Sequence, residues 1–310
     1  MSNDLLSNRS QGVHNERNLT EFNPEKKPSD ETPKQFRVKS IEEYLSAIDQ
    51  IFKILCSPGD STNCTLWYRG QAQTNFDLLP TISRKKNGVQ LNPLYETPIL
   101  SKFKSLAIPY VQSLPGFPLP GGTTSYWSWL FMLRHYGLPA RILDWSSDAL
   151  TALFFATDPT DTSLKKGTDA AVWLLNPVTL NEAFSFHSYL EPGYIPNVEE
   201  ASFNLYFGPN SDLLSTTKPA AAIGPNNTTR IVAQKGTFIV YPRVKELVAL
   251  DQQPDSSSYL YKINIAWENF TDIQTQLKHY GITRLSLYPD IENIAGEVMQ
   301  QVKDESVETI

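Results

Sequence analysis

The spacing of apolar residues predicts amphipathic helices separated by short strands. The first helix covers residues 40–55, where apolar side chains recur every three or four positions and Ser40 with Glu43 has the spacing of a capping box. Further helices are predicted over residues 97–107, 125–136, 148–157 and from 271 to just before 281. A final helix has an apolar face that we assign to packing within the domain: Ile291, Ile294, Ala295, Val298 and Val302.

Three local signals set the expected ends of these helices. Pro109 is expected just past the end of the helix over 97–107, because proline does not continue a helix. Gly137 is expected to close the helix over 125–136 in the left-handed conformation. Thr271 and Gln274 are expected to cap the start of the helix that they begin.

Runs of β-branched and aromatic residues predict the strands, at residues 65–70, 141–145, 170–175, 237–241, 259–266 and 284–288. The mixed order of strands and helices, without an internal repeat or a long linker, predicts one α/β domain over residues 36–303. Residues 1–35 are poor in large apolar side chains, so we expect a flexible polar tail there. Residues 304–310 are expected to form a short C-terminal tail.

Composition narrows the classes of protein that fit. The 310 residues are 40% hydrophobic and carry a net charge of −6, so no global positive field indicates nucleic-acid binding. No apolar run is long enough for a membrane span, and the N-terminus lacks the apolar stretch of a signal peptide, so we expect a soluble cytoplasmic protein. Two cysteines and four scattered histidines are too few for a disulfide scaffold or a common zinc motif, and no metal is expected.

The segment Trp67–Gln71 (WYRGQ) is the first of four patches with residues unusual for a core. Arg69 followed by Gly70 at the end of a strand places a fixed cation beside a backbone that a ligand can approach closely. Two interpretations are open: Arg69 contacts a ligand, or it is a buried arginine satisfied by carbonyl groups.

The second patch, Leu133–Trp145, combines histidine, tyrosine, arginine and aspartate around a glycine and a proline. Asp144 either pairs with Arg69 or Arg141 to hold strand ends, or faces a substrate. His135 is either a structural residue at a helix end or a ligand contact. Residues 146–148 then begin a helix, whose free N–H groups suit an anionic ligand or an ordinary N-cap.

The third patch, Thr229–Pro242, places Arg230 and Gln234 ahead of a glycine and a strand, which fits either a site at a sheet edge or a plain hairpin. We assign the fourth patch, His279–Val298, to packing. None of the four contains a Walker loop, a dinucleotide G-x-G-x-x-G or a G-x-S-x-G elbow. Asp144 and Asp148 are close only in sequence, which is weak support for a paired-carboxylate hydrolase.

In order along the chain, these patches resemble the FRG domain. Trp67–Gln71 resembles the family's F/Y-R-G-Q, and residues 135–145 resemble its H-Y-G-x-P-x-R-x-L-D-W. Ala152–Ala156 resembles the A-L-x-F-A helix that follows. Residues 230–238 resemble R-I-x-x-Q-x-G-x-F, and residues 280–290 resemble the closing L-G-I and L-F-P-D-L. The resemblance extends from about residue 36 to 303.

The order of elements in this family is similar to the ADP-ribosyltransferase fold, a split mixed β-sheet that clamps NAD, with helices outside. By this resemblance Arg69 holds a phosphate or the nicotinamide side, Asp144 lies on the central strand, and Gln234 takes the place of a glutamate; these three are the implied catalytic residues. Gln234 can hydrogen-bond a ribose hydroxyl but supplies no negative charge. The implied contacts to NAD are Tyr68, Gly70, Gln71, His135, Tyr136, Arg141, Trp145, Ser146, Ser147 and Arg230.

The resemblance therefore implies an enzyme that cleaves NAD and modifies a nucleic acid or a protein. Such an activity is toxic, which implies a restraining antitoxin or regulator and fits a prophage or antiviral-defence setting, with no membrane partner. The alternative is a module on the same fold that binds a nucleotide or nucleic acid without reaction.

Overall fold

The computed structural model describes residues 36–56, 64–85, 90–111, 125–184, 193–209, 211, 216–226 and 228–308. The tail predicted over residues 1–35 lies outside the described residues. Contacts within the chain group residues 35–310 into one compact unit. In the described ranges, no helix combines the length and the apolar character needed to cross a membrane.

The core of this unit is a seven-stranded mixed sheet in the order β1-β7-β4-β2-β3-β6-β5. Its strands are β1 (Phe36–Val38), β2 (Trp67–Gln71), β3 (Ile142–Ser146), β4 (Ala170–Leu175), β5 (Ala220–Ala222), β6 (Gly236–Val240) and β7 (Leu260–Ile265). Only the β1–β7 pair is parallel among these strands. The predicted mixed α/β class is confirmed.

The sheet is nearly divided between its two central strands. β2 pairs with β4 along its whole length, from Trp67 opposite Leu175 to Gln71 opposite Ala171. On its other side, β2 meets β3 at a single position, where Tyr68 lies opposite Ser146. Beyond this pair the two strands diverge, so the sheet consists of a β1-β7-β4-β2 half and a β3-β6-β5 half.

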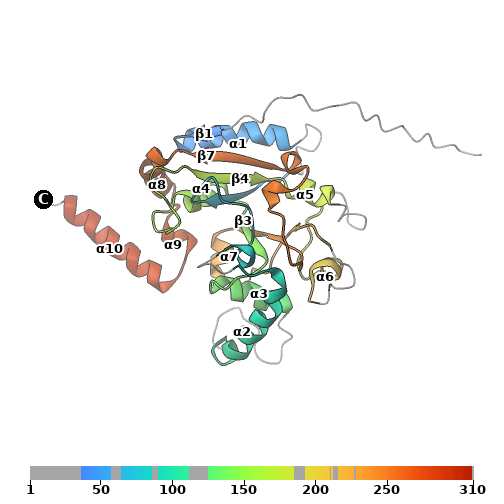
Figure 1. Ribbon diagram of the computed structural model, residues 1–310. Coiled ribbons are helices and arrows are strands. Elements are labelled where there is room, and N and C mark those ends of the chain that lie inside the picture. Colours follow the sequence, from blue (N-terminus) through green and yellow to red (C-terminus); the bar gives the residue numbers. More distant parts are fainter. Residues whose placement is uncertain are drawn as a thin grey trace, which may run out of the picture. The chain divides into compact units, whose positions relative to one another are not determined.

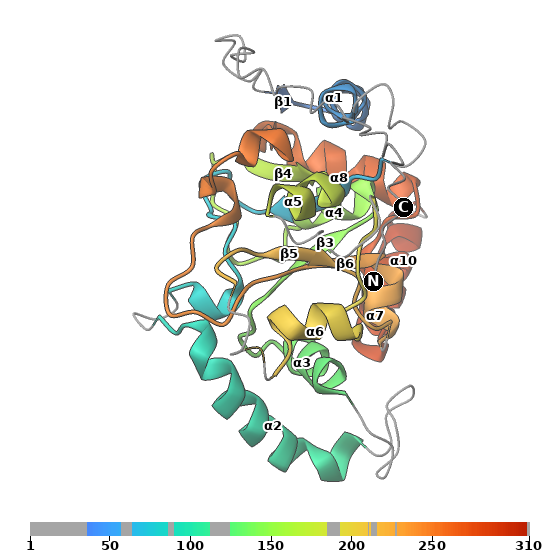
Figure 2. The ribbon, with the colours of Figure 1, turned by 90° about the vertical axis from the view of Figure 1, so that its right-hand side faces the viewer.

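Each half of the sheet has its own helical cover. Helices α1 (Ile41–Leu55), α4 (Ala149–Thr157) and α8 (Phe270–His279) pack with the first half, and α1 runs alongside β7 (Figure 1). Helices α2 (Glu96–Val111), α3 (Tyr126–His135) and α6 (Ala201–Phe207) lie together beside β6 and β5, away from α1 (Figure 2). A third apolar cluster fills the opposite face of the sheet and includes α5 (Pro177–Ala183).

Gly70 fixes how closely α4 packs against β2. A Cβ atom on this residue would lie 2.1 Å from the main-chain oxygen of Ala152 and 2.6 Å from the main-chain nitrogen of Ala156. No side chain fits at that separation, so the glycine is required by the contact between strand and helix. This contact holds in place the strand that carries Arg69.

The predicted helix ends are partly right. Ser40 caps α1 as expected, with its hydroxyl accepting from the Glu43 amide at 3.1 Å. Gly137 has a φ of 78° after α3, as expected for a left-handed closing residue. By contrast, α2 continues through Pro109 to Val111, and α8 begins at Phe270 without the predicted Thr271–Gln274 cap.

The strand predicted at residues 284–288 is wrong. Arg284–Leu287 form the short helix α9, because the side chains of Thr283 and Ser286 cap each other's main-chain amides in a capping box. The last helix, α10 (Ile291–Glu308), continues through most of the predicted C-terminal tail. Its apolar face is exposed rather than packed, with Ile291 at 79% and Val298 at 51% exposure.

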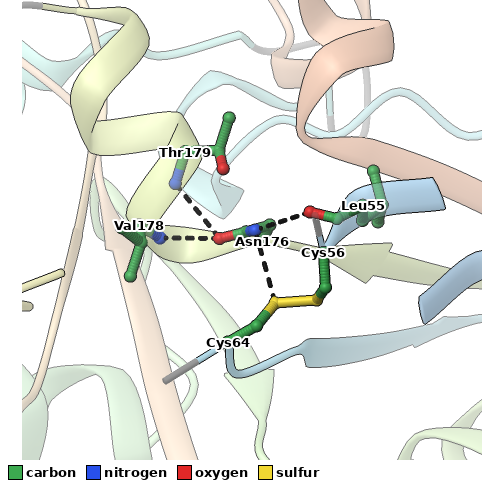
Figure 3. Close-up of a disulfide and its surroundings, with 6 residues drawn as sticks. All are labelled: Leu55, Cys56, Cys64, Asn176, Val178 and Thr179. Atoms are coloured by element: carbon green, nitrogen blue, oxygen red, sulfur yellow. Dashed lines mark hydrogen bonds between the residues drawn. A yellow bond between two sulfur atoms is a disulfide. The ribbon is translucent and has the colours of Figure 1, made fainter. Parts of the chain in front are cut away.

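The two cysteines form a disulfide that the sequence did not predict. Cys56, at the end of α1, is bonded to Cys64, which precedes β2 (Figure 3). The buried side chain of Asn176 holds this junction: its amide nitrogen donates to the Leu55 carbonyl at 2.9 Å and to the Cys64 sulfur at 3.6 Å. The same side chain caps α5 by accepting from the amides of Val178 and Thr179.

Candidate functional site

A cavity of about 470 Å³ opens where β2 and β3 diverge. The three residues implied as catalytic, Arg69, Asp144 and Gln234, all line it. Of the implied NAD contacts, Tyr68, Gly70, Gln71, Trp145 and Ser146 line it as well. The wall also contains residues that the sequence did not predict as site residues, including Phe76, Arg84, Arg134, Phe155, Asp158, Arg284 and Tyr288.

Arg69 and Asp144 reach this cavity from opposite faces of the sheet. Arg69 pairs in register with Trp173, which belongs to the apolar cluster on one face. Asp144 pairs with Phe238, which belongs to a cluster on the other face. Residues paired in register on neighbouring strands point to the same face of the sheet. The side chains of Arg69 and Asp144 therefore leave the sheet on opposite faces. The gap between β2 and β3 lets both of them line one cavity.

The guanidinium of Arg69 has no carboxylate partner among the described residues. One of its terminal nitrogens donates to the main-chain oxygen of Asp144, while its Nε has no hydrogen-bond partner there. Burial and the nearby Arg84 guanidinium lower the pKa of Arg69 to about 9. Since a guanidinium remains charged at neutral pH, its unfavourable surroundings favour the binding of an anion.

Arg84 adds a second positive charge to the same wall. It follows a short 3-10 turn (Thr81–Ser83), and its Nε donates to the Leu79 carbonyl at 2.8 Å. Arg84 is an exposed residue, and partial desolvation of its guanidinium, together with the charge of Arg134, lowers its pKa. Across the described residues, neither Arg69 nor Arg84 forms an ion pair.

The carboxylate of Asp144 pairs with Arg134 of α3. It therefore pairs with neither Arg69 nor Arg141, the two partners that the sequence suggested. The Asp144 side chain is 41% exposed, so it reaches the cavity while it holds Arg134.

Arg141 is a structural residue, and its predicted contact with NAD is not supported by its position. The side chain is fully buried. It lines neither this cavity nor a smaller pocket, of about 300 Å³, that adjoins the cavity. Its Nε lies 2.8 Å from a carboxylate oxygen of Glu96, and its terminal nitrogens donate to the carbonyls of Tyr241 and Phe207. These contacts tie α2 to the end of β6.

The start of α4 is occupied by its own cap. One carboxylate oxygen of Asp148 accepts from the amides of Leu150 and Thr151, both at 2.9 Å, and the other pairs with Lys235 at 2.6 Å. Burial alone would raise the pKa of Asp148, but these partners hold it below its usual value. The N-cap interpretation is thus confirmed, and an external anion has no free place there.

The two serines before this helix are engaged with the protein itself. The hydroxyl of Ser146 donates to the main-chain oxygen of Gln234 at 2.7 Å and accepts from the Asp148 amide. Ser147 points its main-chain amide to the carbonyl of Lys235 at 3.0 Å and lines neither pocket. Both residues join β3 to the segment that precedes β6.

Gln234 is the C-cap residue of the short helix α7 (Thr229–Ala233), just before β6. Its side-chain nitrogen donates to the carbonyl of Leu287 at 3.1 Å. Its side-chain oxygen accepts no hydrogen bond in the described part of the chain, and it remains available to a ligand in the cavity.

A second pocket, of about 300 Å³, adjoins the cavity. The two share five residues, which form a common wall: Arg134, Asp144, Trp145, Gln234 and Tyr288. His135 and Arg230 line this smaller pocket. Tyr136 lies elsewhere; it is 57% exposed and lines an apolar groove formed with α2.

Tyr288 stands between two guanidinium groups. Arg230 lies 4.6 Å from the centre of its ring and Arg284 lies 5.0 Å from it. Arg230 is held by Asp290 at 3.4 Å, and Arg284 by Asp158 at 3.0 Å. The fourth sequence patch, assigned to packing, thus contributes to both pockets; the aromatic residue in its closing motif was the available signal.

One family model matches part of the chain. Residues 64–165 match the family model of the FRG domain, over a stretch that contains β2, β3 and α4. Neither the curated proteins nor the solved structures give a match. The resemblance of residues 230–238 and 280–290 lies beyond the matched stretch and stays a prediction.

Proposed function

We propose that the chain binds NAD at the β2–β3 gap, cleaves it and transfers ADP-ribose to a macromolecule, and we start from the match of residues 64–165 to the family model of the FRG domain. The observation that carries the proposal is the pair of guanidiniums, Arg69 and Arg84, without an acidic partner in the described residues. Such a pair is completed by a ligand with adjacent negative charges. The pyrophosphate of a dinucleotide is a ligand of this kind, and guanidinium groups can bind it through two hydrogen bonds each.

The remaining wall of the cavity suits the other parts of a dinucleotide. Tyr68, Phe155 and Tyr288 supply aromatic surface for a base or the nicotinamide ring. The free side-chain oxygen of Gln234 can accept from a ribose hydroxyl. The smaller pocket adjoins the cavity through a common wall. It can therefore hold the second part of a two-part ligand, or a second substrate next to a ligand bound in the cavity.

In the proposed reaction, the bond between ribose C1′ and the nicotinamide nitrogen breaks, and nicotinamide leaves with the electron pair. A nucleophile of the acceptor forms the new bond to C1′ and loses a proton. The protein positions the two substrates, and the carboxylate of Asp144 stabilises positive charge that develops at C1′. Since NAD consumption is toxic, we include in the proposal a restraining antitoxin or regulator and a role in prophage biology or antiviral defence.

Calorimetric titration of the purified chain with NAD tests the binding step. The Arg69→Lys variant is expected to lose NAD binding, because an ammonium group cannot reproduce the two-pronged contact. Arg37→Lys is the matched control: Arg37 lies on β1, where it pairs with Asp169 and Glu268, outside both pockets. Full NAD affinity in Arg69→Lys would overturn the proposal.

Incubation with NAD labelled in its adenylate part, together with cell protein, DNA and RNA, tests the transfer step. We expect label on one class of macromolecule and release of nicotinamide. The alternative function, a binding module without turnover, is favoured by the commitment of Asp144 to Arg134 and by the absence of a carboxylate at position 234. Binding of NAD without release of nicotinamide would select that alternative.

A further inference from the structure

Helix α10 carries a stripe of apolar side chains that is open to solvent. The large ones keep between 45% and 79% of their surface exposed, and Ala295 between them is exposed as well. Glu297 lies off this stripe and lines a pocket with residues of α4 and α8, so a different side of the helix faces the domain. Figure 1 shows the helix, in red, leaving the rest of the unit beside α9. Apolar side chains gathered on a surface typically mark a contact site. We define the α10 stripe as Ile291, Ile294, Ala295, Val298, Met299 and Val302.

The spacing of the α10 stripe matches itself in reverse. We consider a second copy of the helix laid antiparallel against the first, with the midpoint of the pair between Gly296 and Glu297. Every member of the stripe then lies level with another member of the stripe on the second copy. A surface with this property fits a twofold contact, in which both copies use the same patch. The level pairs are Ile291 with Val302, Ile294 with Met299, and Ala295 with Val298.

The charges that flank the stripe are complementary in the same register. Glu292 and Lys303 are both exposed, and they lie on the same flank because they are separated by about three turns of the helix. In an antiparallel pair, each flank meets the same flank of the other copy, so Glu292 lies within one turn of Lys303 of the second copy. The twofold axis makes two such pairs. A parallel arrangement would instead bring each charge beside its own copy, where like charges repel.

From this complementarity of shape and charge, we propose that α10 pairs antiparallel with α10 of a second copy and that the chain thereby forms a twofold dimer. Small side chains, Ala295 and Val298, lie next to the axis and let the two helices approach closely. The stripe extends over about 18 Å at the rise of an α-helix. A contact of this length is small for a protein interface, so we expect a dimer that dissociates on dilution. This inference does not depend on the proposed function.

A second exposed apolar surface offers the matched control. Leu106 of α2 is 65% exposed and lines an apolar groove with Tyr110 and Tyr136, whereas Val298 of the stripe is 51% exposed. A lysine at either position meets solvent in the monomer, so neither substitution is expected to unfold the domain. Only the substitution at Val298 places two ammonium groups next to the proposed twofold axis.

Sedimentation of the full chain over a range of concentrations tests the dimer. We expect the mass of the wild type to rise from 34.9 kDa toward twice this value as the concentration increases. Val298→Lys should remain monomeric over the same range, and Leu106→Lys should associate like the wild type. Far-UV circular dichroism and thermal unfolding of both variants confirm that each is folded. A wild type that stays monomeric, a dimer that persists in Val298→Lys, or a dimer that Leu106→Lys dissociates would each overturn the proposal.

Exchange of the flanking charges tests the antiparallel register. Glu292→Lys and Lys303→Glu each oppose like charges across the dimer, so each should weaken association about tenfold at low salt. The double variant restores opposite charges at both contacts and should associate like the wild type. In a parallel pair, each position meets its own copy, and none of the three variants changes the sign of the interaction. Equal association of the wild type and both single variants would therefore overturn the antiparallel pairing.

Discussion

The guanidinium of Arg69 donates a hydrogen bond to the main-chain oxygen of Asp144, across the gap at which β2 and β3 separate. This bond joins the two halves of the sheet where the strand ladder no longer does. The carboxylate of the same Asp144 points to the other face and pairs with Arg134. One residue thus supplies its backbone to one arginine and its side chain to another, and both arginines line the cavity.

This arrangement predicts that the side chain of Asp144 can be neutralised without unfolding. We expect Asp144→Asn to abolish transfer of ADP-ribose while the melting temperature changes little, since a partly exposed ion pair contributes at most about 1 kcal/mol. Label transfer and thermal unfolding of the same preparation check this. A large loss of stability would instead assign the carboxylate to the fold.

Arg141 is predicted to behave in the opposite way. Arg141→Met leaves the carboxylate of Glu96 buried and without its partner, so we expect the free energy of unfolding to fall by about 3–5 kcal/mol. Denaturation by urea measures this loss. The double variant with Glu96→Leu removes the orphaned charge as well and should recover part of the stability; no recovery would mean that packing, not charge, dominates.

Replacement by alanine is expected to have different effects at Gly70 and at Gly296, because the added methyl group has different surroundings. Gly70→Ala drives a Cβ into the backbone of α4 and should lower stability by about 1–3 kcal/mol, with loss of NAD binding as β2 shifts. Gly296→Ala is the control: it lies in α10, where the added Cβ meets no atom within 4 Å apart from its chain neighbours and the backbone of its own helix, and helix propensity favours alanine there. Equal stability of the two variants would contradict the close contact between β2 and α4.

The sequence was sufficient to predict most elements, because these depend on local patterns. Strand β4 was predicted with its observed ends, Ala170–Leu175, since a continuous apolar run leaves little choice. Arg69, Asp144 and Gln234 line one cavity, as the order of motifs implied. The ion-pair partner of Asp144 could not be predicted from local patterns. Its pairing with Arg134 depends on how helix α3 packs relative to strand β3.

Other misses have equally specific causes. Residues 284–288 have the apolar content of a strand, but the reciprocal caps of Thr283 and Ser286 favour a helix over the β-propensity. The periodicity of α10 shows which residues share a face but not whether another element covers it, and that face is exposed. Arg84 lies outside the four patches and Arg284 lies in the patch assigned to packing, so only the folded chain brings them to the site.

The ion pair of Asp148 with Lys235 predicts a specific dependence of stability on pH. The pKa of Asp148 is lower in the folded chain than its ordinary value of 3.8, so its charge stabilises the fold above that value. This contribution is lost as the pH falls through the folded-state pKa, because protonation then favours the unfolded chain. Asp148→Asn keeps a good capping residue without the charge. The difference in free energy of unfolding between the wild type and this variant, measured by denaturation, should therefore be constant near neutral pH and shrink below pH 3.8. A difference that grows in acid would exclude this role for the ion pair.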